Sequence, residues 1–210
     1  MKRTLAILIC ATVSISVFSQ TRAVTETGEE VILFNDGTYV YANEEEAPMS
    51  QVKLNLKEFT KSEESTFLLK SKKVNMGFWL DPKKWSFSKP TDNPDAEYEI
   101  ALKGEDLYGV IITEKIEVPL ESLKIIVLEN AKSLAPDIHV VQEEYRKVNG
   151  QKVLFLQLDG TAQGMKISYY GYVYSNESGT VQLITFTSQN LLNPYKEDAE
   201  KLINGLVLLD

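Results

Sequence analysis

Long β-prone segments fill the second half of the chain. Apolar and polar positions alternate along them, β-branched and aromatic residues are frequent, and turn-forming sequences separate them. One such turn sequence is Asn149-Gly150, a pair that tolerates the positive φ of a tight hairpin. The pattern predicts a meander of four antiparallel strands. These strands are residues 139–148, 152–162, 166–174 and 181–187.

Shorter β-prone segments precede this meander. Pro82 fixes φ at the second position of a turn over residues 81–85, and residues 104–106 form another turn. The pattern therefore predicts additional strands in the first half of the main domain. They are residues 66–69, 74–80, 98–102 and 108–118.

Two segments carry apolar residues at helical spacing. The first begins at Pro119, which suits the first position of a helix, and ends before Pro136. The second has Asn193 as its N-cap and Pro194 at its first position. The apolar stripe of the first helix is Leu120, Leu123, Val127, Ala131 and Leu134. That of the second is Tyr195, Ala199, Leu202, Ile203 and Leu206.

The strand at residues 166–174 has large side chains on both of its faces. Ile167, Tyr169 and Val173 alternate with Tyr170, Tyr172 and Tyr174. Such a strand is typical of a sheet that is covered on both sides. We therefore expect an α+β fold in which an antiparallel sheet has helices on both faces, an α/β/α sandwich.

The N-terminus has the pattern of a cleavable signal peptide over residues 1–19. Lys2 and Arg3 precede an apolar, uncharged run at residues 4–18, and we expect cleavage near Ser19-Gln20. A transmembrane anchor would need a run of roughly 18 apolar residues or more. Cys10 lies too early for a lipoprotein site and follows a large residue. The chain is therefore expected to be exported to the periplasm or the extracellular space, with no stable membrane span after cleavage.

Two short segments follow the signal peptide. Residues 20–42 are predicted to form a β-hairpin, because Asn35-Asp36-Gly37 is a strong turn sequence between two β-prone runs. Residues 43–61 are predicted to be an acidic linker, with adjacent glutamates at residues 44–46 and a proline at Pro48. The main α+β domain is expected over residues 62–210.

The charge and the cysteine content exclude several classes of function. The net charge is −8 with a sequence pI of about 4.9, and no basic stripe is visible. A nucleic-acid partner is therefore disfavoured. Cleavage of the signal peptide would remove Cys10, the only cysteine. The mature chain would then contain no disulfide and no thiol nucleophile.

Candidate catalytic and metal-binding residues are few. His139 is the only histidine, and the chain has no Gly-x-Ser-x-Gly motif. A hydrolase that uses His139 as its base is the least favoured reading. A zinc site is disfavoured, because it would draw on several Cys and His ligands. A hard cation held by Asp137, His139 and distant carboxylates is a less favoured alternative. We expect no catalytic residue and no cofactor.

Aromatic residues offer a more informative hypothesis. Trp and Tyr are enriched in binding sites, although most aromatic residues serve in core packing. The candidate binding residues are Trp79, Trp85, Tyr170, Tyr172 and Tyr174.

The segments around these aromatics resemble the PsbP-like fold. The similarity rests on residues 77–85 (GFWLDPKKW), on the turn at residues 148–150 with its long following strands, and on the helix that contains residues 202–203. That group includes photosystem lumenal proteins, a Ran-binding import factor and exported bacterial proteins. The N-terminal hairpin, in turn, resembles a "DGTW/Y" hairpin of many exported Bacteroidetes proteins, with Tyr39 at the aromatic position.

The resemblance implies an α/β/α sandwich and a mostly non-enzymatic group of binding or assembly factors. We therefore expect an exported, non-catalytic protein of the periplasm or cell envelope that acts through contacts with an unidentified envelope protein. The alternative is a carrier of a small apolar ligand held between the sheet and a helix. An enzyme is the third and weakest alternative.

Overall fold

The computed structural model describes residues 21–25, 28, 30–33, 39–41, 52–91 and 93–209. The predicted signal peptide, its cleavage site and the hairpin turn at residues 35–37 lie outside these residues, as do residues 43–51 of the predicted acidic linker. Among the described residues, no helix is long and apolar enough to cross a membrane.

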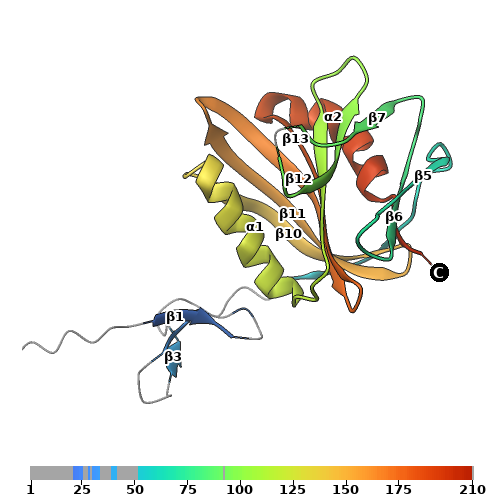
Figure 1. Cartoon of the computed structure of the whole chain (residues 1–210). Helices are drawn as coiled ribbons and strands as arrows, with labels where there is room; N and C mark the ends of the chain where they lie inside the picture. The colour runs from blue at the N-terminus through green and yellow to red at the C-terminus, as the bar shows by residue number, and fades with distance from the viewer. Residues whose placement is uncertain are drawn as a thin grey trace, which may run out of the picture.

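An eight-stranded sheet forms the centre of the main domain (Figure 1). Its order is β4-β10-β11-β12-β13-β9-β8-β7. In that order, the strands are Leu54–Phe59, His139–Val148, Gln151–Ala162, Met165–Asn176, Gly179–Ser188, Tyr108–Glu114, Ala96–Leu102 and Trp85–Ser88.

The four long strands β10 to β13 confirm the predicted meander. Each pairs with the next in antiparallel register, for example Leu154 with Val173. Asn149 and Gly150 have φ values of 46° and 84° in the first turn, as the sequence pair requires. The sheet is nevertheless mixed, because the edge strand β4 runs parallel to β10.

Different elements cover the two faces of this sheet. The helix α1 (Leu120–Leu134) packs on one face, against β11 and β12. The opposite face carries the helix α2 (Gln189–Ile203) together with a small second sheet of order β14-β6-β5. The strands of this sheet are Leu206–Leu208, Met76–Leu80 and Phe67–Lys70. In Figure 1, α1 lies to the left of the long strands β10 to β13, while α2, β5 and β6 lie to their right.

The predicted α/β/α sandwich is therefore wrong. In the described part of the chain, strands clearly predominate over the two helices, the sheet is mixed, and each face carries a single helix. The physical premise of the prediction was sound, since Tyr170, Tyr172 and Tyr174 are buried on the α2 face and Val173 is buried on the α1 face. Cover on the α2 face comes from the strands of the second sheet as well as from α2. The alternation pattern of β12 predicts that a face is covered, but not whether helices or strands cover it.

Several short elements were not predicted. The strand β4 lies within residues 43–61, for which the sequence pattern predicts a linker, and β7 and β14 have only four and three residues. Helix α2 begins at Gln189, so Pro194 lies inside it instead of at its start. Leu192 in this first turn is buried in the core, and we infer that this packing outweighs the hydrogen bond that Pro194 cannot donate.

A separate three-stranded sheet precedes the main domain. It consists of β1 (Thr21–Val24), β2 (Glu30–Leu33) and β3 (Tyr39–Tyr41). β2 and β3 pair in antiparallel register, with Val31 opposite Tyr41, as a hairpin requires. Gly28 lies against the first turn of α1, because a Cβ added there would come within 2.9 Å of the Cβ of Glu121.

Candidate functional site

The predicted aromatic binding residues lie mostly in the core on the α2 face. Trp85, Tyr170, Tyr172 and Tyr174 have exposed fractions of 3%, 0%, 0% and 7%. Only Trp79 is partly exposed, and the Nζ atom of Lys61 lies 5.1 Å from the centre of its ring. These positions leave little aromatic surface for a partner, and a binding role for the five residues stays a prediction.

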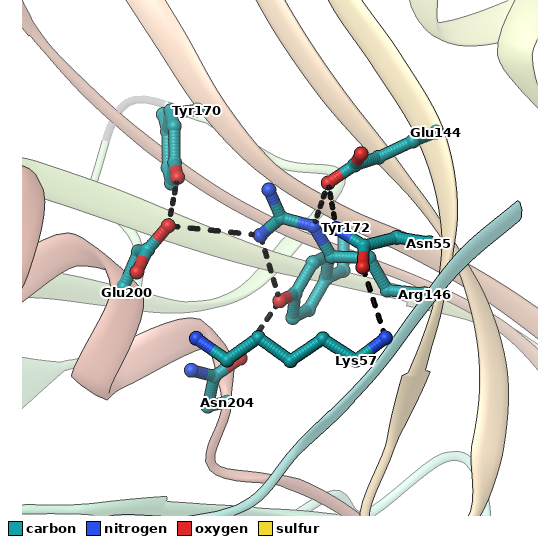
Figure 2. Close-up of polar contacts among 8 residues, drawn as sticks. All are labelled: Asn55, Lys57, Glu144, Arg146, Tyr170, Tyr172, Glu200 and Asn204. Atoms are coloured by element: carbon teal, nitrogen blue, oxygen red, sulfur yellow. Dashed lines mark hydrogen bonds and ion pairs between the residues drawn. The ribbon is translucent and has the colours of Figure 1, made fainter. Parts of the chain in front are cut away.

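Two of these tyrosines belong to a buried polar network around Arg146 (Figure 2). Arg146 on β10 donates from Nε to Glu144 at 2.6 Å and from an Nη atom to the hydroxyl of Tyr172 at 3.2 Å. The same Nη atom lies 3.8 Å from a carboxylate oxygen of Glu200 on α2. The hydroxyl of Tyr170 donates to that oxygen at 2.6 Å. The network therefore connects β10, β12 and α2.

Aromatic rings enclose the guanidinium of Arg146. Its central carbon lies 3.7 Å from the centre of the Phe155 ring and 4.6 Å from that of Phe59. Burial raises the pKa of Tyr172 to about 12, although the nearby guanidinium acts in the opposite direction. The phenol therefore keeps its proton at neutral pH and donates to Asn204 at 2.7 Å. No fully buried side-chain nitrogen or oxygen of these residues lacks a hydrogen-bond partner, which is typical of a structural site.

Asp137 and His139 lie outside this network. Asp137 belongs to the connection between α1 and β10, and His139 is the first residue of β10. One carboxylate oxygen of Asp137 accepts a hydrogen bond from the backbone N–H of Thr161 at 2.6 Å, and this lowers the pKa of Asp137. The exposed imidazole of His139 contacts the carbonyl oxygen of Asp137 at 3.2 Å. In the described part of the chain, no three His, Cys, Asp or Glu side chains gather into a possible metal site. A metal role for this pair stays a prediction.

A large groove lies on the α1 face of the sheet. Helix α1 packs over β11 and β12, and the neighbouring strands β13, β9 and β8 continue beyond it as the floor of the groove. The loop at residues 93–95 closes the opposite side. The groove has a volume of about 980 Å³.

The lining of this groove is mainly apolar and aromatic. On the floor, Val110 and Ile112 of β9 lie beside Ile184 of β13. Val127 and Ala131 form the wall on α1. The other apolar lining residues are Phe87, Pro94, Ile100, Ala101, Tyr108, Leu134, Leu156, Leu158, Ile167, Tyr169 and Phe186.

Aromatic rings and one exposed leucine lie along this groove. The rings of Tyr108 and Phe186 stack with their centres 5.9 Å apart, and Tyr169 lies 6.2 Å from Phe186. Leu134 is 68% exposed although it belongs to the apolar stripe predicted for α1. The stripe therefore extends past the surface that it packs against, and its C-terminal end lines the groove.

The polar groups of the groove carry either no charge or a negative charge. Asp95 and Glu99 are its two acidic lining residues, and none of the described lining residues is Lys, Arg or His. The neutral polar side chains are those of Ser86, Ser88, Asn93, Asn130, Ser133 and Gln182. No histidine, cysteine or lysine is therefore present to act as a nucleophile or a general base within this lining.

The groove was not predicted, although the sequence contains part of the signal for it. Tyr108, Val110 and Ile112 alternate on one face of β9, and Gln182, Ile184 and Phe186 do so on β13. Before α1, the described part of the main domain contains no helix that could cover these residues. An apolar strand face without a matching helix indicates either an open surface or cover by other strands.

Comparisons with known proteins identify only the fold. No protein-family model matches the chain, and no curated protein matches it. Among solved structures, the chain is similar to a cyanobacterial PsbP (CyanoP) from Synechocystis sp. PCC 6803. The TM-score is 0.52 at 12% identity, over 68% of this chain and 91% of that one. The two proteins therefore share the PsbP-like fold that the sequence resemblance implied.

Two further structures are less similar. One is PA94 from Pseudomonas aeruginosa, described as a protein of unknown function and putative regulator, with a TM-score of 0.45 and 12% identity over 69% of this chain and 97% of that one. The other is LpqN from Mycobacterium tuberculosis, described as involved in cell envelope biogenesis. Its TM-score is 0.43 at 12% identity, over 64% of this chain and 83% of that one.

Proposed function

We propose that this chain is an exported, non-catalytic binding protein of the periplasm or cell envelope, and that the groove beside α1 is its binding site. The groove holds an apolar ligand between the helix and the sheet. The N-terminal sequence of residues 1–19 supports export. A PsbP-like fold is compatible with a protein that binds without catalysis.

The observation that carries this proposal is the size and lining of the groove. Small-molecule sites in proteins measure roughly 300–1,000 Å³, are mostly apolar and contain a few polar groups. The groove beside α1 has a volume of about 980 Å³, and Val110, Ile184 and Val127 expose apolar atoms to it. Transfer of apolar ligand surface out of water onto this floor supplies the binding free energy.

Contact with an envelope protein is the second candidate function, and one observation favours it. Phe67 on β5 and Phe87 on the edge strand β7 stack with their ring centres 5.3 Å apart. They are 39% and 43% exposed. Two adjacent exposed aromatic rings are a frequent anchor in protein interfaces. A photo-crosslinking amino acid at Phe67 that captures the same envelope protein in repeated experiments would support this candidate.

A neutral fluorescent probe tests the proposed ligand site. N-phenyl-1-naphthylamine becomes brighter when it enters an apolar environment, and we expect a saturable increase with the mature protein. The variant Ala131→Phe places a ring in the groove and should weaken probe binding by tenfold or more, on the order of 1.4 kcal/mol. Ala131 is only partly buried, so the larger side chain has space on the groove side.

The matched control is Glu129→Phe on the same helix. Glu129 does not line the groove and its side chain is 62% exposed. This variant should bind the probe as tightly as the unaltered protein. Equal binding by the unaltered protein and by Ala131→Phe, with both variants folded by circular dichroism, would contradict the proposed site.

A further inference from the structure

The charge pattern of the groove specifies the ligand more narrowly than its apolar floor does. We propose that the groove selects a small amphiphile with an apolar body and a cationic end group, such as an amine or a quaternary ammonium, over its anionic counterpart. This inference rests on the proposed function, since it concerns the same groove. Three features of the lining carry it.

The first feature is the pair of carboxylates on the side of the groove away from α1. Glu99 projects from β8, and Asp95 lies in the loop that closes that side. Glu99 is held in place because one of its oxygens accepts the backbone N–H of Thr91 at 3.2 Å. A carboxylate fixed at the edge of an apolar floor attracts a cation more strongly than one in bulk water, since the local dielectric constant is lower.

The second feature is the C-terminal end of α1. Its last turn lines the groove through Ala131, Ser133 and Leu134. The carbonyl groups at the end of a helix carry a partial negative charge, and this charge favours a nearby cation. Lys132 is the basic residue of this turn, but its Nζ atom lies 2.6 Å from Glu129 and it does not line the groove.

The third feature is the lack of positive charge in the lining that the structure describes. A carrier of fatty acids or other apolar anions usually needs a cation or several N–H donors for the acidic group. Here, an anionic end group would meet the carboxylates of Asp95 and Glu99 instead. A cationic end group would meet both as partners while its chain covers the apolar floor at Val110 and Ile184.

A matched series of ten-carbon ligands tests this selectivity. Decyltrimethylammonium, decanol and decanoate share one chain length and differ in the charge of the end group. Each is titrated below its micelle concentration against N-phenyl-1-naphthylamine bound to the full mature protein. We expect decyltrimethylammonium to displace the probe at about tenfold lower concentration than decanoate in low salt, with decanol between them. The difference should shrink as salt screens the carboxylates.

Neutral substitutions then locate the source of the selectivity. Glu99→Gln and Asp95→Asn should each reduce the preference for the cation by about threefold, because each removes one charge while keeping nearly the same shape. The binding of decanol should not change. The control Glu177→Gln alters an exposed carboxylate that does not line the groove, and its preference should equal that of the unaltered protein.

The possible outcomes separate this inference from the proposed function. Equal displacement by all three ligands, or strongest displacement by decanoate, overturns the charge selectivity and leaves the groove as an apolar site. No binding of the probe or of any decyl ligand overturns the proposed function as well. If the double variant Asp95→Asn/Glu99→Gln still prefers the cation, these two carboxylates are not the cause of the preference, and the inference is overturned.

Discussion

At the scale of single residues, Arg146 is the side chain on which the α2 face depends most. Its exposed fraction is 4%, and Glu144, Tyr172 and Glu200 surround its guanidinium. Burial of an unpaired charge costs free energy. Removal of the positive charge or of either carboxylate would therefore destabilise the remaining members of the group. The arrangement explains why a charged residue is tolerated between two phenylalanine rings in the core.

We predict that Arg146→Ala lowers the free energy of unfolding by about 3–5 kcal/mol, because it leaves the carboxylates without their cation and opens a cavity. Urea denaturation followed by circular dichroism measures this change. The matched control is Lys147→Ala on the same strand, where both members of the ion pair with Glu58 are more than half exposed. That variant should lose less than about 1 kcal/mol. Similar losses in the two variants would contradict a structural role for Arg146.

The sequence did not point to this arginine, and the reason is physical. The alternation of apolar and polar residues along residues 139–148 assigns Arg146 to one face of the strand. It does not predict that carboxylates from β10 and α2 meet on that face. Tyr170 and Tyr172 were singled out for binding because aromatic residues serve both in cores and in interfaces. Burial decides between these roles, and it depends on contacts far apart in the chain.

At the scale of elements, the close approach of β12 and β13 is set by Gly171. A Cβ at this position would come within 2.2 Å of the carbonyl oxygen of Leu183 and 2.8 Å of the Cδ1 atom of Ile184. The carbonyl belongs to the backbone of a central strand and cannot move without disturbing the sheet. The added Cβ atom would also displace the side chain of Ile184, which lines the groove.

We predict that Gly171→Ala destabilises the fold by about 2 kcal/mol, since overpacking against a backbone forces strands to shift. Gly77→Ala is the matched control in another buried strand. There the added Cβ would meet the ends of two leucine side chains, Leu68 and Leu209, which can rotate away. Thermal unfolding should show a clearly larger loss for Gly171→Ala, and the reverse order would contradict this account of the sheet.

Long elements were predicted well and short ones poorly. The meander from β10 to β13 was found because ten or more residues of alternation and the Asn149-Gly150 turn agree. The strands β4, β7 and β14 are too short to show a period, and they form through pairing with distant strands. The start of α2 was misplaced because the burial of Leu192 outweighs the preference of Pro194 for a first helical turn.

At the scale of the whole molecule, the two faces of the large sheet are built differently. The α2 face is closed by a helix and a second sheet, and its polar groups are paired with one another. The α1 face is covered only in part, which leaves the groove over β13, β9 and β8. Periodicity shows which residues face one side of a sheet, but not how far a helix extends across it. The groove could therefore be identified only from the structure.

The central claim is that the groove beside α1 binds an apolar ligand. Methyl-group NMR of the isotope-labelled chain without its predicted signal peptide, titrated with decanol, tests it most directly. The claim predicts saturable shifts confined to methyl groups of the groove, such as those of Val110, Val127 and Ile184, with none at Ile203 in the core beside α2. Shifts that do not saturate, or that centre on the α2 face, would contradict it.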